Sequence, residues 1–142
     1  MKLRDVMTPN PRTVAPDASL QEAARIMRDA DTGMVPVVDN GRPIGLLTDR
    51  DIVVRAVADG ATARPVREVA STDLVVASPE LSTKEAADLM GQHQVRRLLV
   101  CENDRLVGVA SLGDLAVKEG KDRRVGTALE DISQGVKERS DF

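Results

Sequence analysis

The sequence predicts an α/β (α+β) fold made of two tandem copies of one unit, and three observations lead to this prediction. Residues 13–52 align with residues 76–115 at an offset of 63 without a gap, and eleven of the 40 aligned positions are identical. In each copy, a Ser-x-x-Glu spacing precedes apolar residues at helical spacing. Two short apolar runs joined by turn residues then follow. Because self-similarity at a fixed period marks a repeated structural unit, we expect the order strand–helix–strand–strand–helix twice.

The first helix of each copy is predicted from its capping residues. A short extended segment, residues 12–14 or 74–76, comes before it and ends near a proline. The helix is then opened by Ser19-x-x-Glu22 in the first copy and by Ser82-x-x-Glu85 in the second. This spacing predicts a capping box, in which the serine and glutamate side chains each accept a backbone N–H. We interpret these four residues as caps only.

Two strands and a second helix complete each copy. The strands are expected at residues 35–38 and 44–47, and again at 98–101 and 107–110. The turns between them, Asp39-Asn40-Gly41 and Glu102-Asn103-Asp104, hold residue types that favour hairpins. The second helix is expected to begin near Thr48 and near Ser111.

These patterns divide the chain into four parts. Repeat 1 covers residues 5–58, a linker with Gly60 and Pro65 covers 59–68, repeat 2 covers 69–118, and a charged tail covers 119–142. One short helix is expected in the tail, over residues 125–132.

Composition excludes several classes of function. The net charge of −3 provides no basic surface for nucleic acid and no polybasic patch for an anionic membrane. The chain has no Trp and no Tyr, and its only Phe is Phe142, so bases cannot stack on aromatic rings. No apolar run approaches the length of a membrane span, and the first residues lack the apolar core of a signal peptide. We therefore expect a cytoplasmic protein that binds neither nucleic acid nor membrane.

The sequence also contains little that could catalyse a reaction. It has one cysteine, Cys101, inside an apolar run where a small core residue is expected, and one histidine, His93, near a predicted helix end. One His and one Cys are too few for a zinc site built from those ligands. There is no paired acid and base and no P-loop. We expect no catalytic residues, no bound metal and no enzymatic activity.

The duplicated pattern resembles the tandem CBS domain pair, named after cystathionine β-synthase, over about residues 5–118. The residues that carry the resemblance in the first copy are Val35-Pro36-Val37-Val38-Asp39 and Gly45-Leu46-Leu47-Thr48-Asp49-Arg50-Asp51-Ile52. In the second copy they are Val95-Arg96-Arg97-Leu98-Leu99-Val100 and Gly108-Val109-Ala110-Ser111-Leu112-Gly113-Asp114-Leu115. The chain looks like the small stand-alone bacterial members, of which hypoxic response proteins are one kind.

The resemblance implies a pseudo-twofold module that regulates by binding AMP, ADP, ATP or another adenosyl compound in clefts between the repeats. No catalytic cofactor is expected. Such modules commonly form homodimers, and any output would pass to a separate effector protein. The alternative function is a dimerisation or partner-docking module that binds no nucleotide.

The candidate site lies where a strand gives way to a helix in each copy. A helix N-terminus presents N–H groups and a partial positive charge that suit phosphate. The resemblance implies that Thr48 and Ser111 offer hydroxyls to phosphate and that Asp51 and Asp114 accept ribose hydroxyls. The same Thr-x-x-Asp and Ser-x-x-Asp spacings are also capping boxes, so the spacing alone leaves both roles open.

Further site residues also follow from the resemblance. The adenine ring would lie against Thr13, Val14, Val35 and Pro36 in one site and against Val76, Ala77, Leu98 and Leu99 in the other. The alternative role for the apolar side chains among them is ordinary core.

Charged residues distinguish the two copies. Arg50 of the first copy is replaced by Gly113 in the second, whereas Arg97 of the second replaces Met34 of the first. Both arginines are included among the predicted nucleotide-binding residues, and the two sites are not expected to be equivalent. Arg97 is expected to contact a phosphate, with an exposed strand edge as the alternative.

Apolar residues on the second helix of each copy predict a dimer surface. They are Ile52, Val53, Val57, Leu115 and Val117.

Overall fold

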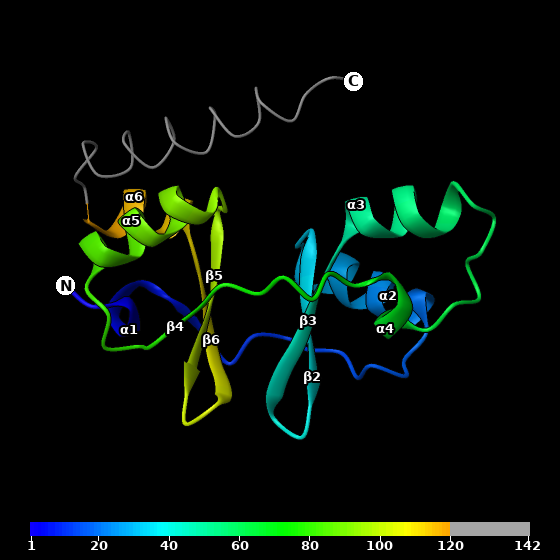
Figure 1. Cartoon of the computed structure of the whole chain (residues 1–142), viewed down its shortest axis with the longest axis horizontal. Helices are drawn as coiled ribbons and strands as arrows, with labels where there is room; N and C mark the ends of the chain where they lie inside the picture. Colours follow the sequence, from blue (N-terminus) through cyan, green and yellow to red (C-terminus); the bar gives the residue numbers. More distant parts are fainter. Residues whose placement is uncertain (120–142) are drawn as a thin grey trace. The chain divides into compact units, whose positions relative to one another are not determined.

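A computed structural model describes the backbone of residues 1–119 and the side chains of residues 1–117. The tail helix expected over residues 125–132 lies outside the described residues. Figure 1 shows helices and short strands in two groups, and contacts divide the chain into two compact units. Of the described residues, unit 1 holds Met1–Pro9, Val75–Glu102 and 107–119, and unit 2 holds Asn10–Leu74 and Asn103–Leu106. The mixed helix and strand fold with two repeats is as predicted.

Unit 2 is built on a two-stranded hairpin with a helix packed on it. The strands β2 (Met34–Asp39) and β3 (Arg42–Thr48) pair antiparallel, and Val14 forms a parallel bridge to β2. Helix α2 (Leu20–Ala30) packs against β2 (Figure 1). After β3 come α3 (Asp49–Asp51) and the π-helix η1 (Ile52–Val57). The buried core contains Val14, Leu20, Ala23, Met27, Val35, Val37, Leu47, Ala56, Val66 and Val69.

Unit 1 repeats this arrangement in a four-stranded sheet of order β1-β6-β5-β4. Its strands are β1 (Thr8–Pro9), β4 (Val76–Ala77), β5 (Arg97–Glu102) and β6 (Arg105–Ser111). Its longer helices are α5 (Thr83–His93) and α6 (Leu112–Glu119). Within residues 1–119, no helix is long and apolar enough to cross a membrane.

The serine half of each predicted capping box forms, and so do the predicted turns, whereas neither Glu22 nor Glu85 is found accepting the backbone N–H of its serine. The Ser19 hydroxyl accepts from the N–H of Glu22 at 3.0 Å, and the Ser82 hydroxyl accepts from that of Glu85 at 3.1 Å. The loop between β2 and β3 consists of Asn40 and Gly41, both with positive φ (51° and 84°). Positive φ at both loop residues is what a two-residue hairpin of the right twist requires, and glycine adopts it without strain.

A short helical turn completes each unit, and neither turn is predicted from the repeated sequence pattern. Helix α1 (Leu3–Val6) belongs to unit 1, and α4 (Val66–Val69), which lies in the predicted linker and start of repeat 2, belongs to unit 2. The offset of 63 relates these two turns as well. Each turn therefore packs into the unit formed mainly by the other repeat, and the apolar residues of both turns are fully buried.

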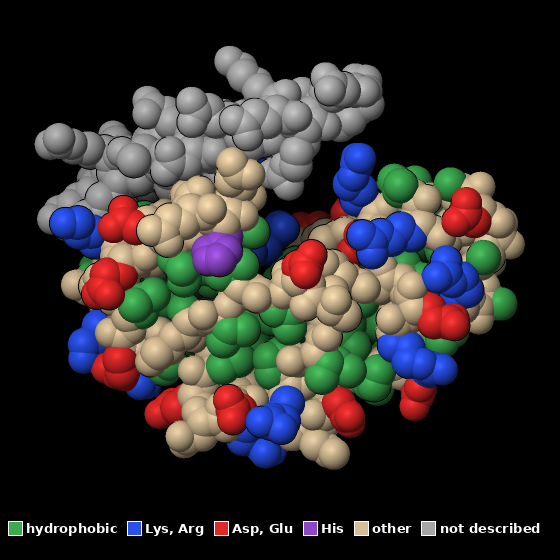
Figure 2. Space-filling view, in the orientation of Figure 1, with side chains coloured by type: hydrophobic (Ala, Val, Ile, Leu, Met, Phe, Trp, Pro, Cys, Tyr) green, Lys and Arg blue, Asp and Glu red, His purple; other side chains and the backbone are tan. Residues whose placement is uncertain are grey.

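Matching hydrogen bonds attach the two turns. In unit 1, Leu3 N–H donates to the Leu81 carbonyl at 2.8 Å, and in unit 2, Val66 N–H donates to the Ala18 carbonyl at 2.9 Å. An ion pair accompanies each, Arg4 with Glu80 and Arg67 with Asp17. These pairs are on the surface, where charges of both signs are interspersed (Figure 2).

Glu80 accepts from two cations. Lys2 Nζ lies 2.7 Å from Glu80 Oε2, and Arg4 Nε lies 2.8 Å from Oε1. The hydrogen bond from Lys2, followed by that from Arg4, lowers the pKa of the Glu80 carboxyl below its ordinary value of 4.5. A carboxyl with a lowered pKa in the folded state stabilises the fold above its unfolded pKa and loses that contribution as the pH falls.

The buried position of α4 predicts a loss of stability when its packing is cut back. Val69→Ala should lower the free energy of unfolding by about 2 kcal/mol, because two methyl groups leave a fully buried site. Ile44→Val, at a side chain that is 41% exposed on β3, is the control and should change it by less than about 0.5 kcal/mol. Urea unfolding measures both, and equal effects would show that α4 is not part of the core.

The contacts of Glu80 predict its titration. The Glu80 carboxyl should titrate below pH 4.5 in the unaltered protein and closer to 4.5 in Lys2→Ala, which removes the first of its two donors. Carboxyl chemical shifts followed by NMR against pH provide the measurement. An unchanged midpoint in Lys2→Ala would show that Lys2 does not bind Glu80 in solution.

Candidate functional site

The junction between β3 and α3 in unit 2 is held by two reciprocal hydrogen bonds. Asp51 N–H donates to Thr48 Oγ1 at 3.1 Å, and Thr48 N–H donates to Asp51 Oδ2 at 3.0 Å. Both residues are half-buried, and the Asp51 side chain is 16% exposed. The predicted capping box is therefore present, with both side chains fixed by backbone groups.

The junction between β6 and α6 in unit 1 has the same construction. Asp114 N–H donates to Ser111 Oγ at 3.0 Å, and Ser111 N–H donates to Asp114 Oδ2 at 3.0 Å. Ser111 and Asp114 are also half-buried. The two repeats thus carry the same pair of side chains, in the same geometry, at the same place in the fold.

Capping leaves each pair able to do more chemistry. A hydroxyl that accepts a backbone N–H still has its own O–H to donate, and a carboxylate offers about four acceptor positions. In unit 2, Thr48 can therefore donate to an anion while Asp51 accepts from a neighbouring hydroxyl. The helix that begins here adds a partial positive charge. A ligand with a hydroxylated ring next to a phosphate matches this set of groups.

In unit 2, the residues predicted to contact the ring are divided between the core and the surface. Val14 and Val35 are core residues, 4% and 0% exposed. Pro36 is buried outside that core cluster, and Thr13 is exposed. Val14 N–H donates to the Pro36 carbonyl at 3.0 Å, so this segment and β2 lie side by side.

In unit 1, the matching residues divide in the same way. Ala77 and Leu98 belong to the core, whereas Leu99, which is 2% exposed, lies outside that cluster. Val76 is 45% exposed. Consecutive strand residues point to opposite faces of a sheet, so of Leu98 and Leu99 only one can face the helices. The same alternation places Val35 in the core and Pro36 on the opposite face.

The two predicted arginines occupy different positions. Arg50 is exposed on α3, one residue before Asp51. Arg97 is exposed at the start of β5, and the N–H of Leu112 donates to the carbonyl of Arg96 at 2.9 Å. That bond brings the start of β5 next to the Ser111 junction. Each arginine thus lies close to the capping box of its own unit.

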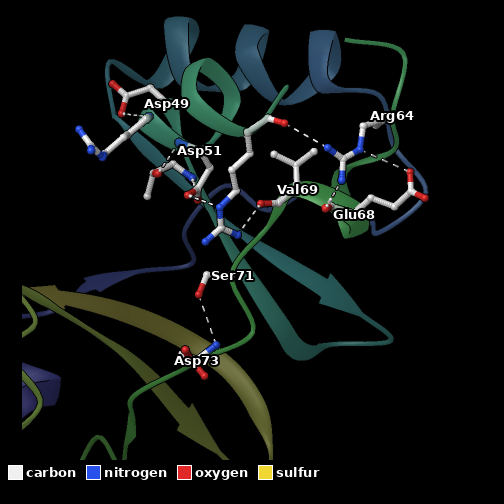
Figure 3. Close-up of polar contacts among 10 residues, drawn as sticks. Asp49, Asp51, Arg64, Glu68, Val69, Ser71 and Asp73 are labelled. Atoms are coloured by element: carbon white, nitrogen blue, oxygen red, sulfur yellow. Dashed lines mark hydrogen bonds and ion pairs between the residues drawn. The ribbon is translucent and has the colours of Figure 1, made fainter. Parts of the chain in front are cut away.

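Sequence reasoning missed one further charged neighbour, Arg55. Its Nε lies 3.8 Å from Asp51 Oδ1 (Figure 3). The signal that could have revealed it is the four-residue spacing between Asp51 and Arg55, since side chains four apart on a helix are neighbours.

The apolar side chains predicted to form a dimer surface need one correction. Leu115 is 1% exposed and belongs to the core of unit 1, because it faces the sheet and not solvent. Ile52 is half-buried and packs against the core of unit 2. Val53, Val57 and Val117 are exposed.

The sequence's one His and one Cys are not members of the two capping boxes. His93 is exposed at the end of α5, and Cys101 is half-buried in β5 and not fully buried as predicted. Among the side chains that the structure describes, no three His, Cys, Asp or Glu residues form a group that could hold a metal ion.

Comparison with known proteins identifies the family. Residues 3–57 and 66–118 each match the sequence model of the CBS domain. The CBS domain-containing protein YhcV of Bacillus subtilis is 45% identical over 132 residues, which cover 92% of this chain and 94% of that protein. The chain belongs to the CBS domain family and is a CBS domain pair. The matched ranges include α1 and α4, and their first residues, 3 and 66, are 63 apart, as the turns are.

Solved structures share this fold. A crystal structure of Hypoxic Response Protein I with two coordinated zinc ions has a TM-score of 0.74 and 35% identity, covering 82% of this chain and 98% of that chain. The CBS domain pair of MJ0100, in complex with 5′-methylthioadenosine and S-adenosyl-L-methionine, has a TM-score of 0.75 at 23% identity (84% and 96% covered). CBSX2 in complex with AMP has a TM-score of 0.73 at 21% identity (86% and 98% covered).

Proposed function

We propose that this CBS domain pair is a regulatory module that binds an adenosyl compound, most simply AMP, ADP or ATP, at the two strand-to-helix junctions. One observation carries the proposal: both repeats hold a hydroxyl and a carboxylate in the same backbone-fixed geometry, at 3.0–3.1 Å. Capping alone accounts for a hydroxyl and a carboxylate at a helix N-terminus. The same two groups also match the phosphate and the ribose of a nucleotide, which are adjacent.

Each side chain has a defined role in this proposal. Thr48 and Ser111 donate their O–H groups to a phosphate oxygen at a helix N-terminus. Asp51 and Asp114 accept hydrogen bonds from the ribose hydroxyls through the lone pairs that the backbone does not use. CBS pairs of similar fold are known with AMP and with S-adenosyl-L-methionine bound, and this supports an adenosyl ligand.

The base would be bound by aliphatic side chains, because the sequence has no Trp or Tyr. Thr13 and Val76 are the predicted ring contacts with exposed side chains. Pro36 and Leu99 lie outside the core clusters of their units and are the next candidates. Val14, Val35, Ala77 and Leu98 would support these contacts from the core.

Removing each carboxylate tests the proposal. Asp51→Ala and Asp114→Ala should each lower the affinity of one site for AMP by about ten- to a hundredfold, because a hydrogen bond to a charged group is worth about 1.5–3 kcal/mol. Asp49→Ala, which removes an exposed neighbouring carboxylate, is the matched control and should leave binding unchanged. Calorimetric titration measures affinity, and thermal unfolding confirms that each variant folds. Unchanged affinity in the double variant, or no binding by the unaltered protein, would favour a partner-docking module with no nucleotide.

The position of Arg97 predicts selectivity for phosphate at the unit 1 site. Arg97→Ala should weaken ATP binding more than adenosine binding, because the guanidinium would contact phosphate oxygens and not the base. It should also flatten the salt dependence of ATP binding, since salt screens such a contact. Calorimetry with adenosine and ATP at two salt concentrations tests both effects. Equal losses for both ligands would place Arg97 at an exposed strand edge without a ligand role.

A homodimer is a further proposal, supported by exposed apolar side chains on η1. Val53, Val54 and Val57 are 58%, 50% and 53% exposed. Apolar groups that are close together on one helix favour association, which removes them from water. Light scattering at tens of micromolar protein (roughly, for an interface of standard size) should give the mass of a dimer, and Val53→Asp should shift it to that of a monomer. A monomer in the unaltered protein would exclude this interface.

A further inference from the structure

The two carboxylate oxygens of Asp51 have different partners. Oδ2 accepts the backbone N–H of Thr48 at 3.0 Å, whereas Oδ1 lies 3.8 Å from Arg55 Nε (Figure 3). Because Oδ2 is already used by the helix cap, Oδ1 has the greater capacity to accept a ligand hydroxyl. The oxygen best placed for ribose is therefore also the one that faces Arg55.

The same guanidinium group of Arg55 also contacts α4. Its Nη1 donates to the carbonyl of Val69, the last residue of α4, at 3.3 Å. A second arginine holds the same region, since Arg64 Nη1 donates to the Arg55 carbonyl at 3.0 Å and Arg64 Nη2 donates to the Glu68 carbonyl at 2.9 Å. A continuous set of contacts thus runs from Asp51 through Arg55 to α4, all within unit 2.

The helix that carries Arg55 has an uncommon form. Residues Ile52–Val57 form a π-helix, in which the Ala58 N–H donates to the Val53 carbonyl, five residues back, at 3.0 Å. Such π-helical turns are rare, and they occur frequently at functional sites. Here the turn begins at Ile52, directly after Asp51, and the two arginines attach it to α4.

At the offset of 63, Arg64 corresponds to Met1, and a methionine side chain has no N–H to donate. Among the described residues, the contacts that Arg64 makes therefore have no counterpart in unit 1. Arg55 corresponds to Lys118, whose side chain lies outside the described residues, so the test compares variants of unit 2.

We propose that Arg55 is a positioning residue that couples the state of Asp51 to α4, and that ligand and Arg55 compete for Asp51 Oδ1. The ligand part rests on the proposed function. A ribose hydroxyl that donates to Oδ1 replaces Arg55, which then holds the Val69 carbonyl less firmly. By linkage, a change that removes the Arg55 contact and leaves the Asp51 carboxylate intact must favour the ligand. Binding at unit 2 is thereby transmitted to the segment that joins the two repeats.

The coupling can be tested without a ligand. Asp51→Asn keeps an acceptor for the Thr48 N–H but removes the charge that attracts Arg55. Hydrogen exchange of the Ala70 amide, which bonds to the Val66 carbonyl at 3.0 Å, should then quicken by about two- to fivefold, the range for a weak ion pair. Asp88→Asn, at an exposed carboxylate of α5, is the control and should leave the Ala70 exchange rate unchanged. No change at Ala70 in Asp51→Asn, or an equal change in Asp88→Asn, overturns the coupling.

The competition is tested with adenosine, which carries no phosphate charge to attract arginine. In an Asp114→Ala background, which leaves only the unit 2 site, Arg55→Ala should bind adenosine about two- to fivefold more tightly. If Arg55 only stabilised the structure of unit 2, Arg55→Ala would weaken adenosine binding instead. Arg25→Ala, at an exposed arginine of α2, should have no effect. Unchanged or weaker binding in Arg55→Ala overturns the competition. One outcome separates the two proposals. If the Asp114→Ala protein binds no adenosine while Asp51→Asn quickens the Ala70 exchange as expected, the proposed adenosyl ligand is wrong and the coupling of Asp51 to α4 is supported.

Discussion

The two units depend on the docking of a four-residue helical turn onto the loop that precedes a longer helix. The backbone N–H groups of Leu3 and Val66 make the same hydrogen bond, to Leu81 and Ala18, and their side chains are fully buried. Because each turn comes from the start of one repeat and packs into the unit formed mainly by the other, neither repeat forms its own unit alone. The docked turn in unit 2 also positions the carbonyl that Arg55 contacts.

The strand-to-helix junctions combine a structural and a chemical role in the same atoms. A hydroxyl and a carboxylate that cap a helix are already fixed, so a ligand that binds them loses little additional side-chain freedom, and preorganisation of this kind favours affinity. In unit 2 the acid also lies near Arg55, with which we propose that a ligand hydroxyl competes. The two sites can therefore share one geometry and still respond differently to the same ligand.

The sequence predicts most of the fold and part of the site, for physical reasons that particular residues illustrate. The strands, the hairpin turns and the serine caps follow from local patterns, and the structure confirms them. Docking of α4 is not local, since the contact of Val66 with Ala18 joins segments far apart in the chain. The resemblance places both Val35 and Pro36 against the ring, whereas the burial of Val35 in the core and the alternation along the strand depend on the folded sheet.

The central claim is that the two capping pairs are the places where an adenosyl ligand binds. Amide NMR spectra recorded while AMP is added test it most directly. If AMP binds at both junctions, the amides of Thr48, Asp51, Ser111 and Asp114 should shift progressively and reach saturation, while the amides of α2 and α5 change little. Spectra that do not change at millimolar AMP, or shifts confined to residues away from both junctions, would contradict it.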